Sequence, residues 1–167
     1  QVTRLALRDF QFEQRGVQFL DAYSGVEGVK MLEENPDCAV CLVDVVMESE
    51  HAGLDTAKAI RNQLHNHYVR VVLRTGQPGQ APEEQIISEY DINDYKEKTE
   101  LTRSKLFTLM YACLRSYRDI IALDASVKKI QSMNEGLEDK VRQRTQALEE
   151  EKKRADAANQ AKSKFLA

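Results

Sequence analysis

The strongest constraint on the fold is the alternation of short apolar runs with amphipathic helical segments over the first two thirds of the chain. The apolar runs cover residues 17–23, 39–45, 69–73 and 92–95. Runs of this length, with many β-branched residues, are typical of buried strands. Strands that alternate with helices usually form a parallel sheet covered on both faces. We therefore expect an α/β fold with a doubly wound parallel sheet.

The helical segments carry their own boundary signals. Apolar spacing predicts helices over residues 2–10, 24–32, 53–64, 86–90 and 101–117. Gly16 is expected to mark the break after the first helix. Ser24 is the expected N-cap of the second, because Glu27 follows at capping-box spacing. Pro82 suits the first position of the fourth helix.

Charge and hydropathy exclude several classes of partner. The formal net charge is −3, which gives no general basic field for nucleic acid. No apolar run is long enough to span a bilayer, and the N-terminus does not resemble a signal peptide. We expect a cytoplasmic segment with neither a nucleic-acid nor a membrane partner.

The three cysteines are an odd number, which argues against a closed disulfide framework. Cys38 and Cys41 form a C-x-x-C pair that could in principle bind zinc or be redox-active. We interpret them as buried thiols, since residues three apart on a strand point to opposite faces and no second pair follows.

Polar residues stand at the predicted ends of three strands. Asp44 ends an otherwise apolar strand, Thr75 ends the next, and Lys98 follows the last. In open parallel sheets the chemistry lies beyond the carboxyl ends of the strands. A carboxylate nucleophile, a hydroxyl and an ammonium group could there converge on one phosphoryl group.

Four short motifs surround these residues in order along the chain. They are Asp44-Val-Val-Met47, Ala52-Gly-Leu54, Leu73-Arg-Thr-Gly76 and Asp94-Tyr-Lys-Glu-Lys98. In this order and spacing they resemble the CheY-like response-regulator receiver family. The resemblance implies a flavodoxin-like sheet and a phosphorelay function.

The same resemblance implies a role for each site residue. Asp44 would accept the phosphoryl group, Thr75 would be the switch hydroxyl, and Lys98 would be the lysine of the family site. Tyr95 would be the switch aromatic. Asp44 and the backbone carbonyl of Val46 would bind Mg²⁺. The phosphodonor would be a histidine kinase or a phosphotransfer protein.

Two features depart from the family at its site. Receivers begin with a strand that ends in an acidic pair, whereas no carboxylate pair precedes Val2, and Thr99 stands where the family has proline. Mg²⁺ prefers several oxygen ligands and binds poorly to one carboxylate. We therefore expect that the natural protein has further residues before this segment. Arg74 is unusual beside Thr75; we interpret it as a solvated side chain, with pairing to nearby carboxylates as the alternative.

The last third of the chain has a heptad pattern. Its a and d positions are Leu123, Val127, Ile130, Asn134, Leu137, Val141, Arg144, Leu148, Glu151, Ala155, Ala158, Lys162 and Phe165. Sustained heptads predict a coiled coil, and an asparagine at an a position favours a parallel two-stranded state. We expect a homodimer through this helix, with a single helix packed on another surface as the alternative.

The end of the chain resembles part of a histidine kinase. Residues 137–148 are similar to the linker before many kinase dimerisation domains, and residues 161–167 are similar to the opening of the first helix of such a domain (HisKA). We therefore divide the chain into a receiver lacking its first strand (1–117), a coiled-coil signalling helix (118–160) and the start of the dimerisation helix (161–167).

Three functions remain open from the sequence. The first is a receiver that regulates an attached histidine kinase through the dimeric helix; the chain itself holds no kinase catalytic domain. The second is a receiver that drives a cyclic-dinucleotide output domain. The third is a scaffold that dimerises without being phosphorylated.

Overall fold

The computed structural model describes residues 2–76 and 83–166. Their elements are α1 (Val2–Ala6), β1 (Gln11–Phe12), β2 (Arg15–Gly16), α2 (Gly25–Glu34), β3 (Val40–Asp44), α3 (Ala52–Asn62), β4 (Arg70–Thr75), α4 (Glu83–Tyr90), β5 (Asp94–Glu97) and α5 (Arg103–Leu166). The chain separates into two compact units, Gln1–Ile121 and Ala122–Ala167.

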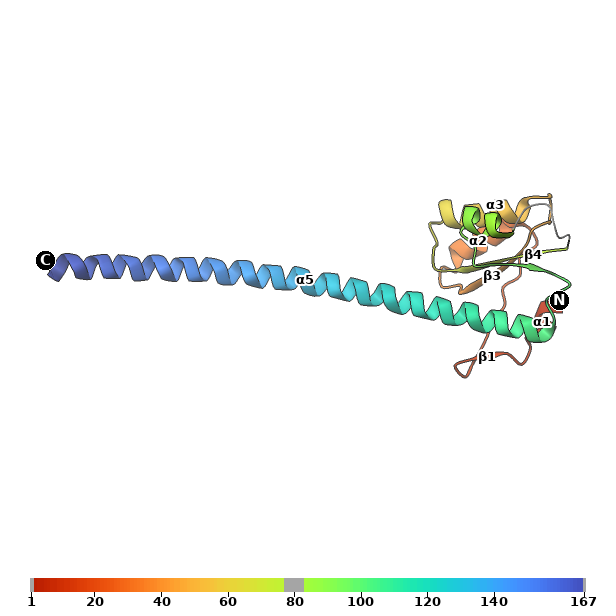
Figure 1. Ribbon diagram of the computed structural model, residues 1–167, viewed down its shortest axis with the longest axis horizontal. Helices are drawn as coiled ribbons and strands as arrows, with labels where there is room; N and C mark the ends of the chain where they lie inside the picture. Colours follow the sequence, from red (N-terminus) through yellow and green to blue (C-terminus); the bar gives the residue numbers. More distant parts are fainter. Residues whose placement is uncertain (1, 77–82, 167) are drawn as a thin grey trace. The chain divides into compact units, whose positions relative to one another are not determined.

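The first unit is built on a three-stranded parallel sheet in the order β3-β4-β5. Alternate residues of β4 point to opposite faces, so Val71 and Leu73 enter one core and Val72 enters the other. Figure 1 shows α2 and α3 on one side of the strands and the start of α5 on the other. The predicted parallel sheet with two covered faces is confirmed.

Each face of the sheet has a separate apolar core. One core is Leu32, Val43, Ala57, Ile60, Val69, Val71, Leu73, Ile86, Ile92 and Tyr95. The other core is Leu7, Phe10, Val72, Leu106, Leu109, Met110 and Cys113. Packing into the two cores fixes the register of each strand against its neighbours, and hence the positions of the strand ends.

Two predictions for the N-terminal part are wrong. The first helix ends at Ala6, and residues 11–16 form a hairpin whose turn residues, Glu13 and Gln14, have φ of 50° and 65°. Such left-handed pairs suit the twist of a two-residue hairpin. Residues 17–23 form no strand. A strand needs a neighbour for its backbone groups, and these residues have none in the described part of the sheet.

The second helix follows its sequence signals. Ser24 is its N-cap, and the hydroxyl oxygen of Ser24 accepts a hydrogen bond from the Glu27 N–H at 3.1 Å. The Glu27 carboxylate in turn accepts from the Tyr23 N–H at 2.7 Å. Pro82 lies outside the described residues, so its predicted helix start stays a prediction.

Contrary to the sequence prediction, Cys38 and Cys41 do not lie on one strand. Cys38 precedes β3, so strand alternation does not apply to it, and both Cys38 and Cys41 contact the same core. Cys38, Cys41 and Cys113 are all free thiols; Cys38 and Cys41 are only partly buried, so the predicted burial of these two thiols is confirmed only in part. Over the described residues, no group of three or more His, Cys, Asp or Glu side chains could hold a metal ion.

The second unit consists of the later part of α5, which is one helix from Arg103 to Leu166. Its heptad apolar side chains are exposed; Leu123, Leu137, Val141 and Leu148 each have more than half of their surface accessible. No described helix has the length and apolar character needed to cross a membrane.

Candidate phosphoryl-acceptor site

The candidate site forms where β3, β4 and β5 end side by side. Asp44, the last residue of β3, is in register with Arg74 of β4, and Thr75 is in register with Glu97 of β5. Backbone hydrogen bonds extend the ladder past the strands: Val45 N–H donates to the Arg74 carbonyl at 2.8 Å, and Lys98 N–H donates to the Thr75 carbonyl at 2.7 Å. The last bond holds Lys98 beside the strand ends.

Two cations flank the Asp44 carboxylate. Lys98 Nζ lies 3.0 Å from Oδ2, and Arg74 Nη2 lies 2.9 Å from Oδ1. About a third of the Asp44 side chain is exposed, compared with 21% for Arg74 and 48% for Lys98. The carboxylate is therefore accessible from solvent while held at both oxygens.

The Arg74 contact is an ion pair without hydrogen-bond geometry. Asp44 Oδ1 and Arg74 Nε are both buried atoms that have no hydrogen-bond partner. The 2.9 Å distance to Nη2 is short, but the N–H does not point along the line to the oxygen. Each side of the pair therefore keeps unused hydrogen-bonding capacity, which is unusual for buried polar atoms.

The loop after β3 is held by two contacts. Gly53 N–H donates to the Val45 carbonyl at 2.9 Å, which seats the start of α3 on the end of β3. Glu48 Oε1 accepts from the Gly25 N–H at 2.9 Å, at the start of α2, where a negative charge is favourable. These contacts fix the backbone on both sides of Val46.

The predicted site residues are brought together only in part. Asp44 and Lys98 are in direct contact, and Thr75 is a buried residue joined to Lys98 through its backbone. Tyr95 is 8% exposed and packs in the core that holds Leu73.

For Arg74, the favoured interpretation as a solvated side chain is wrong, and the alternative of pairing with a carboxylate is correct. The side chain is mostly buried against Asp44, and its Nη1 donates to Thr3 Oγ1 at 2.9 Å, a contact that the sequence did not indicate. A usable signal was present: in a parallel pair, the residue before Thr75 stands in register with the last residue of the neighbouring strand.

The described residues do not by themselves form a magnesium site. Asp44 supplies one carboxylate, and its orphaned Oδ1 faces a guanidinium instead of a second acidic side chain. Mg²⁺ needs a near-octahedral set of oxygen ligands, which one carboxylate and one carbonyl do not complete. Magnesium binding by Asp44 and the Val46 carbonyl thus stays a prediction.

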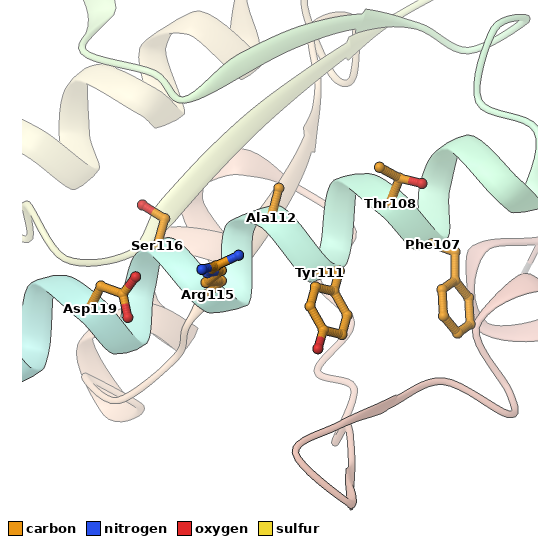
Figure 2. Close-up of a pocket in the computed structure, with 7 residues that line it drawn as sticks. All are labelled: Phe107, Thr108, Tyr111, Ala112, Arg115, Ser116 and Asp119. Carbon is orange, nitrogen blue, oxygen red and sulfur yellow. The ribbon is translucent and has the colours of Figure 1, made fainter.

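A shallow groove lies elsewhere, along the first turns of α5. It is lined by Phe107, Thr108, Tyr111, Ala112, Arg115, Ser116 and Asp119. Figure 2 shows the rings of Phe107 and Tyr111 on the side of α5 opposite to Ala112. Those rings make edge contacts with Phe10 and Phe12, so the groove borders the β1–β2 hairpin. None of the strand-end residues lines it.

Comparison with known proteins places the fold. No family model matches the chain. The chain is 56% identical over 124 residues to 3'3'-cGAMP-specific phosphodiesterase 2 of Vibrio cholerae serotype O1; the match covers 74% of this chain but only 24% of that relative. The chain therefore spans about a quarter of the length of this relative.

Solved structures of receiver domains are similar in fold. The CheY-like response regulator receiver domain protein of Methanospirillum hungatei JF-1 has a TM-score of 0.53 and 22% identity, over 71% of this chain and 86% of that one. The receiver domain of Francisella response regulator 1452 has a TM-score of 0.53 and 18% identity, over 71% and 89%. The first unit thus has the flavodoxin-like fold of receiver domains.

Proposed function

We propose that this chain is a receiver module that accepts a phosphoryl group on Asp44 and transmits the change to an attached output domain through α5. The observation that carries the proposal is the Asp44 carboxylate at the end of β3, with Lys98 Nζ 3.0 Å from one of its oxygens. A carboxylate that is partly open to solvent and paired with a cation suits a nucleophile toward phosphorus.

The proposed reaction balances as a simple transfer. A carboxylate oxygen of Asp44 attacks the phosphorus of a phosphohistidine or a small acyl phosphate. A P–O bond to Asp44 forms while the bond from phosphorus to the donor breaks, and its electron pair leaves with the donor. Lys98 stabilises the charge that spreads over the phosphoryl oxygens.

Thr75 and Tyr95 are the proposed readout residues. Thr75 ends β4 next to the acceptor strand, and Tyr95 lies on β5 and packs in the apolar core that includes Leu73 and Ile86. A phosphoryl group that draws the Thr75 hydroxyl toward Asp44 would repack the buried residues around Tyr95. The two residues would thereby link chemistry at the strand ends to the packing of helices on that face.

Transmission is proposed to use a homodimer of α5. The exposed apolar side chains of the second unit recur at heptad spacing, which suits a two-stranded parallel coil. Asn134 at an a position would fix the register of the two helices. Phosphorylation would bias one packing of the dimer over another, and the output domain would respond to that bias.

Two output domains have support. Residues 161–167 resemble the opening of a histidine-kinase dimerisation helix, which favours a kinase. The 56% identity to a 3'3'-cGAMP-specific phosphodiesterase favours an output that acts on a cyclic dinucleotide. Assay of the natural full-length protein separates them: ATP-dependent labelling of a histidine supports the kinase, and hydrolysis of the cyclic dinucleotide supports the phosphodiesterase.

The phosphoryl-acceptor proposal is tested by intact mass. The chain is incubated with acetyl phosphate and magnesium chloride, and the mass is measured before and after. We expect the mass of the unsubstituted chain to increase by one phosphoryl group, and the mass of the Asp44→Asn variant to stay the same. Asp94→Asn is a matched control, since Asp94 is also a strand carboxylate with a lysine 2.9 Å away. Equal gains in the natural protein and Asp44→Asn would refute the assignment.

A further inference from the structure

Arg74 is placed as a fixed cation at the candidate site. Its guanidinium is held by the Thr3 hydroxyl at 2.9 Å on one side and faces Asp44 Oδ1 at 2.9 Å on the other. The backbone of Arg74 is itself tied to the acceptor strand through the Val45 N–H at 2.8 Å. The side chain is thus oriented before any phosphoryl group arrives.

Without a phosphoryl group on Asp44, the Arg74 guanidinium does not use all of its hydrogen-bond donors. Arg74 Nε is buried and has no hydrogen-bond partner, and neither has Asp44 Oδ1, the oxygen that lies near Arg74 Nη2. A guanidinium offers five N–H donors in a planar fork that matches phosphate and carboxylate oxygens in pairs. A buried donor left unpaired beside a nucleophile is a place where a further acceptor would be favourable.

Phosphorylation of Asp44 would supply that acceptor. The carboxylate carries one negative charge, whereas a phosphorylated side chain carries about −1.5 to −2 and three strong acceptor oxygens. Lys98 contacts the opposite carboxylate oxygen, so a phosphoryl group on Asp44 would lie between two cations. Nε, which has no hydrogen-bond partner, and Nη2 together form one edge of the planar guanidinium.

We propose that Arg74 is a phosphoryl-binding residue, which takes two oxygens of the group formed on Asp44 through Nε and Nη2. This inference rests on the proposed function of Asp44. Arg74 stabilises the transferring group and the phosphorylated product more than it stabilises free Asp44. Lysine is a poor substitute, because an ammonium group cannot bind two oxygens in the same planar manner.

The test uses four variants of the chain. Arg74→Met removes the charge and the donors, and Arg74→Lys keeps the charge but loses the fork. Thr3→Val removes the hydroxyl that holds the guanidinium. Arg142→Met is the matched control, because Arg142 is an exposed guanidinium of the second unit, 3.9 Å from Asp139. Circular dichroism and thermal melting report whether each variant is folded.

Two quantities are measured with magnesium chloride present. The first is the rate of phosphorylation by acetyl phosphate, followed by intact mass. The second is the dissociation constant for fluoroberyllate, a phosphoryl analogue, measured by calorimetry. For Arg74→Met we expect both to worsen about 10- to 100-fold, the range of one charged hydrogen bond. Arg74→Lys and Thr3→Val should show smaller losses, and Arg142→Met none.

The outcomes separate this inference from the proposed function. If the natural protein gains no phosphoryl group on Asp44, the proposed function fails, and this inference fails with it. If the unsubstituted chain is phosphorylated, and Arg74→Met has the same phosphorylation rate and the same dissociation constant for fluoroberyllate, the inference alone is overturned. Faster phosphorylation of Arg74→Met would also overturn it, because Arg74 would then block Asp44. If Arg74→Met does not fold, Arg74→Lys decides in the same way.

Discussion

Gly53 lies directly against the backbone of Asp44: a Cβ added at Gly53 would stand 2.2 Å from the Asp44 carbonyl oxygen and 2.7 Å from the Val45 Cα. No side chain fits there unless α3 moves away from β3. The contact explains why a glycine follows Ala52 in the second of the four motifs, and it sets the distance between α3 and Asp44.

The first prediction concerns this contact. Gly53→Ala should destabilise the first unit by about 1–3 kcal/mol or more, because the added carbon meets backbone atoms that cannot rotate away. The measurement is urea unfolding followed by circular dichroism. Gly28→Ala is the matched control: Gly28 also lies in a helix, but its nearest neighbour would be the Ala22 Cβ at 3.7 Å. That variant should be neutral or more stable, and equal losses in both would contradict the account.

The second prediction concerns Arg61, a buried cation away from the site. Its guanidinium is 5% exposed and donates to the carbonyls of Asp91 at 2.9 Å and Asn66 at 2.6 Å. Burial lowers the pKa of Arg61, and the Asp91 carboxylate opposes that shift. Arg61→Met should lower the free energy of unfolding by about 1.5–3 kcal/mol, since it removes the hydrogen bonds from a charged group to two partly buried carbonyls.

Lys58→Met is the comparison for Arg61. Lys58 is about half exposed and lies 3.8 Å from Glu89, so its loss should cost less than about 1 kcal/mol. Chemical unfolding of both variants checks the pair. If Lys58→Met lowers the free energy of unfolding more than Arg61→Met does, the hydrogen bonds of Arg61 do not hold the loop between α4 and β5.

The third prediction concerns the thiols. Burial raises the pKa of Cys41 to about 12 and that of Cys113 to about 11, from an ordinary value of 9.0. Because the folded state holds these protons more tightly, the stability they contribute is complete below pH 9. It is lost as pH rises from 9 through the folded values.

Thiol labelling measures this effect. At pH 8 the native protein should react with iodoacetamide at Cys41 and Cys113 far more slowly than the urea-unfolded protein, because thiolate is the reactive form. Peptide mass analysis separates the two positions. Native labelling at the unfolded rate would contradict the described burial.

The fourth prediction concerns the proposed dimer. Asn134→Leu should raise the thermal stability of α5 and allow oligomers larger than a dimer to form beside the dimer. The reason is that a buried asparagine selects a two-stranded register at a cost in stability. Analytical ultracentrifugation over a range of concentrations measures the state. Gln146→Leu, at an f position outside the seam, is the control and should change neither. A monomer at every concentration for the natural protein would rule out the dimer.

The sheet was predictable because its strands carry a local signal. Val71, Val72 and Leu73 are all fully buried, and a continuous apolar run of this kind has few other places in a fold. Ser24 was predictable for a similar reason: capping depends on residues three apart, and the Ser24–Glu27 bond needs no distant partner. Features that depend on neighbours in sequence were therefore well predicted.

Features that depend on residues far away in the sequence were not well predicted. Residues 17–23 have strand composition, yet strand formation requires a second backbone, and composition does not report whether one is present. Arg74 is paired through a register between two strands 30 positions apart in sequence, so pairing with a carboxylate could be named from the sequence only as an alternative, and Asp44 is identified as the partner only by the strand register. The hairpin turn is a local feature and was missed for a different reason: Glu13 and Gln14 adopt left-handed φ, although neither is a glycine or an asparagine.

The most direct test of the account is the chemical location of the phosphoryl group. The phosphorylated protein is treated with sodium borohydride, which reduces an aspartyl phosphate to homoserine, and the peptides are then sequenced by mass spectrometry. The account predicts homoserine at position 44 and at no other aspartate. Homoserine at another position, or an intact Asp44 in protein incubated with acetyl phosphate and magnesium, would contradict it.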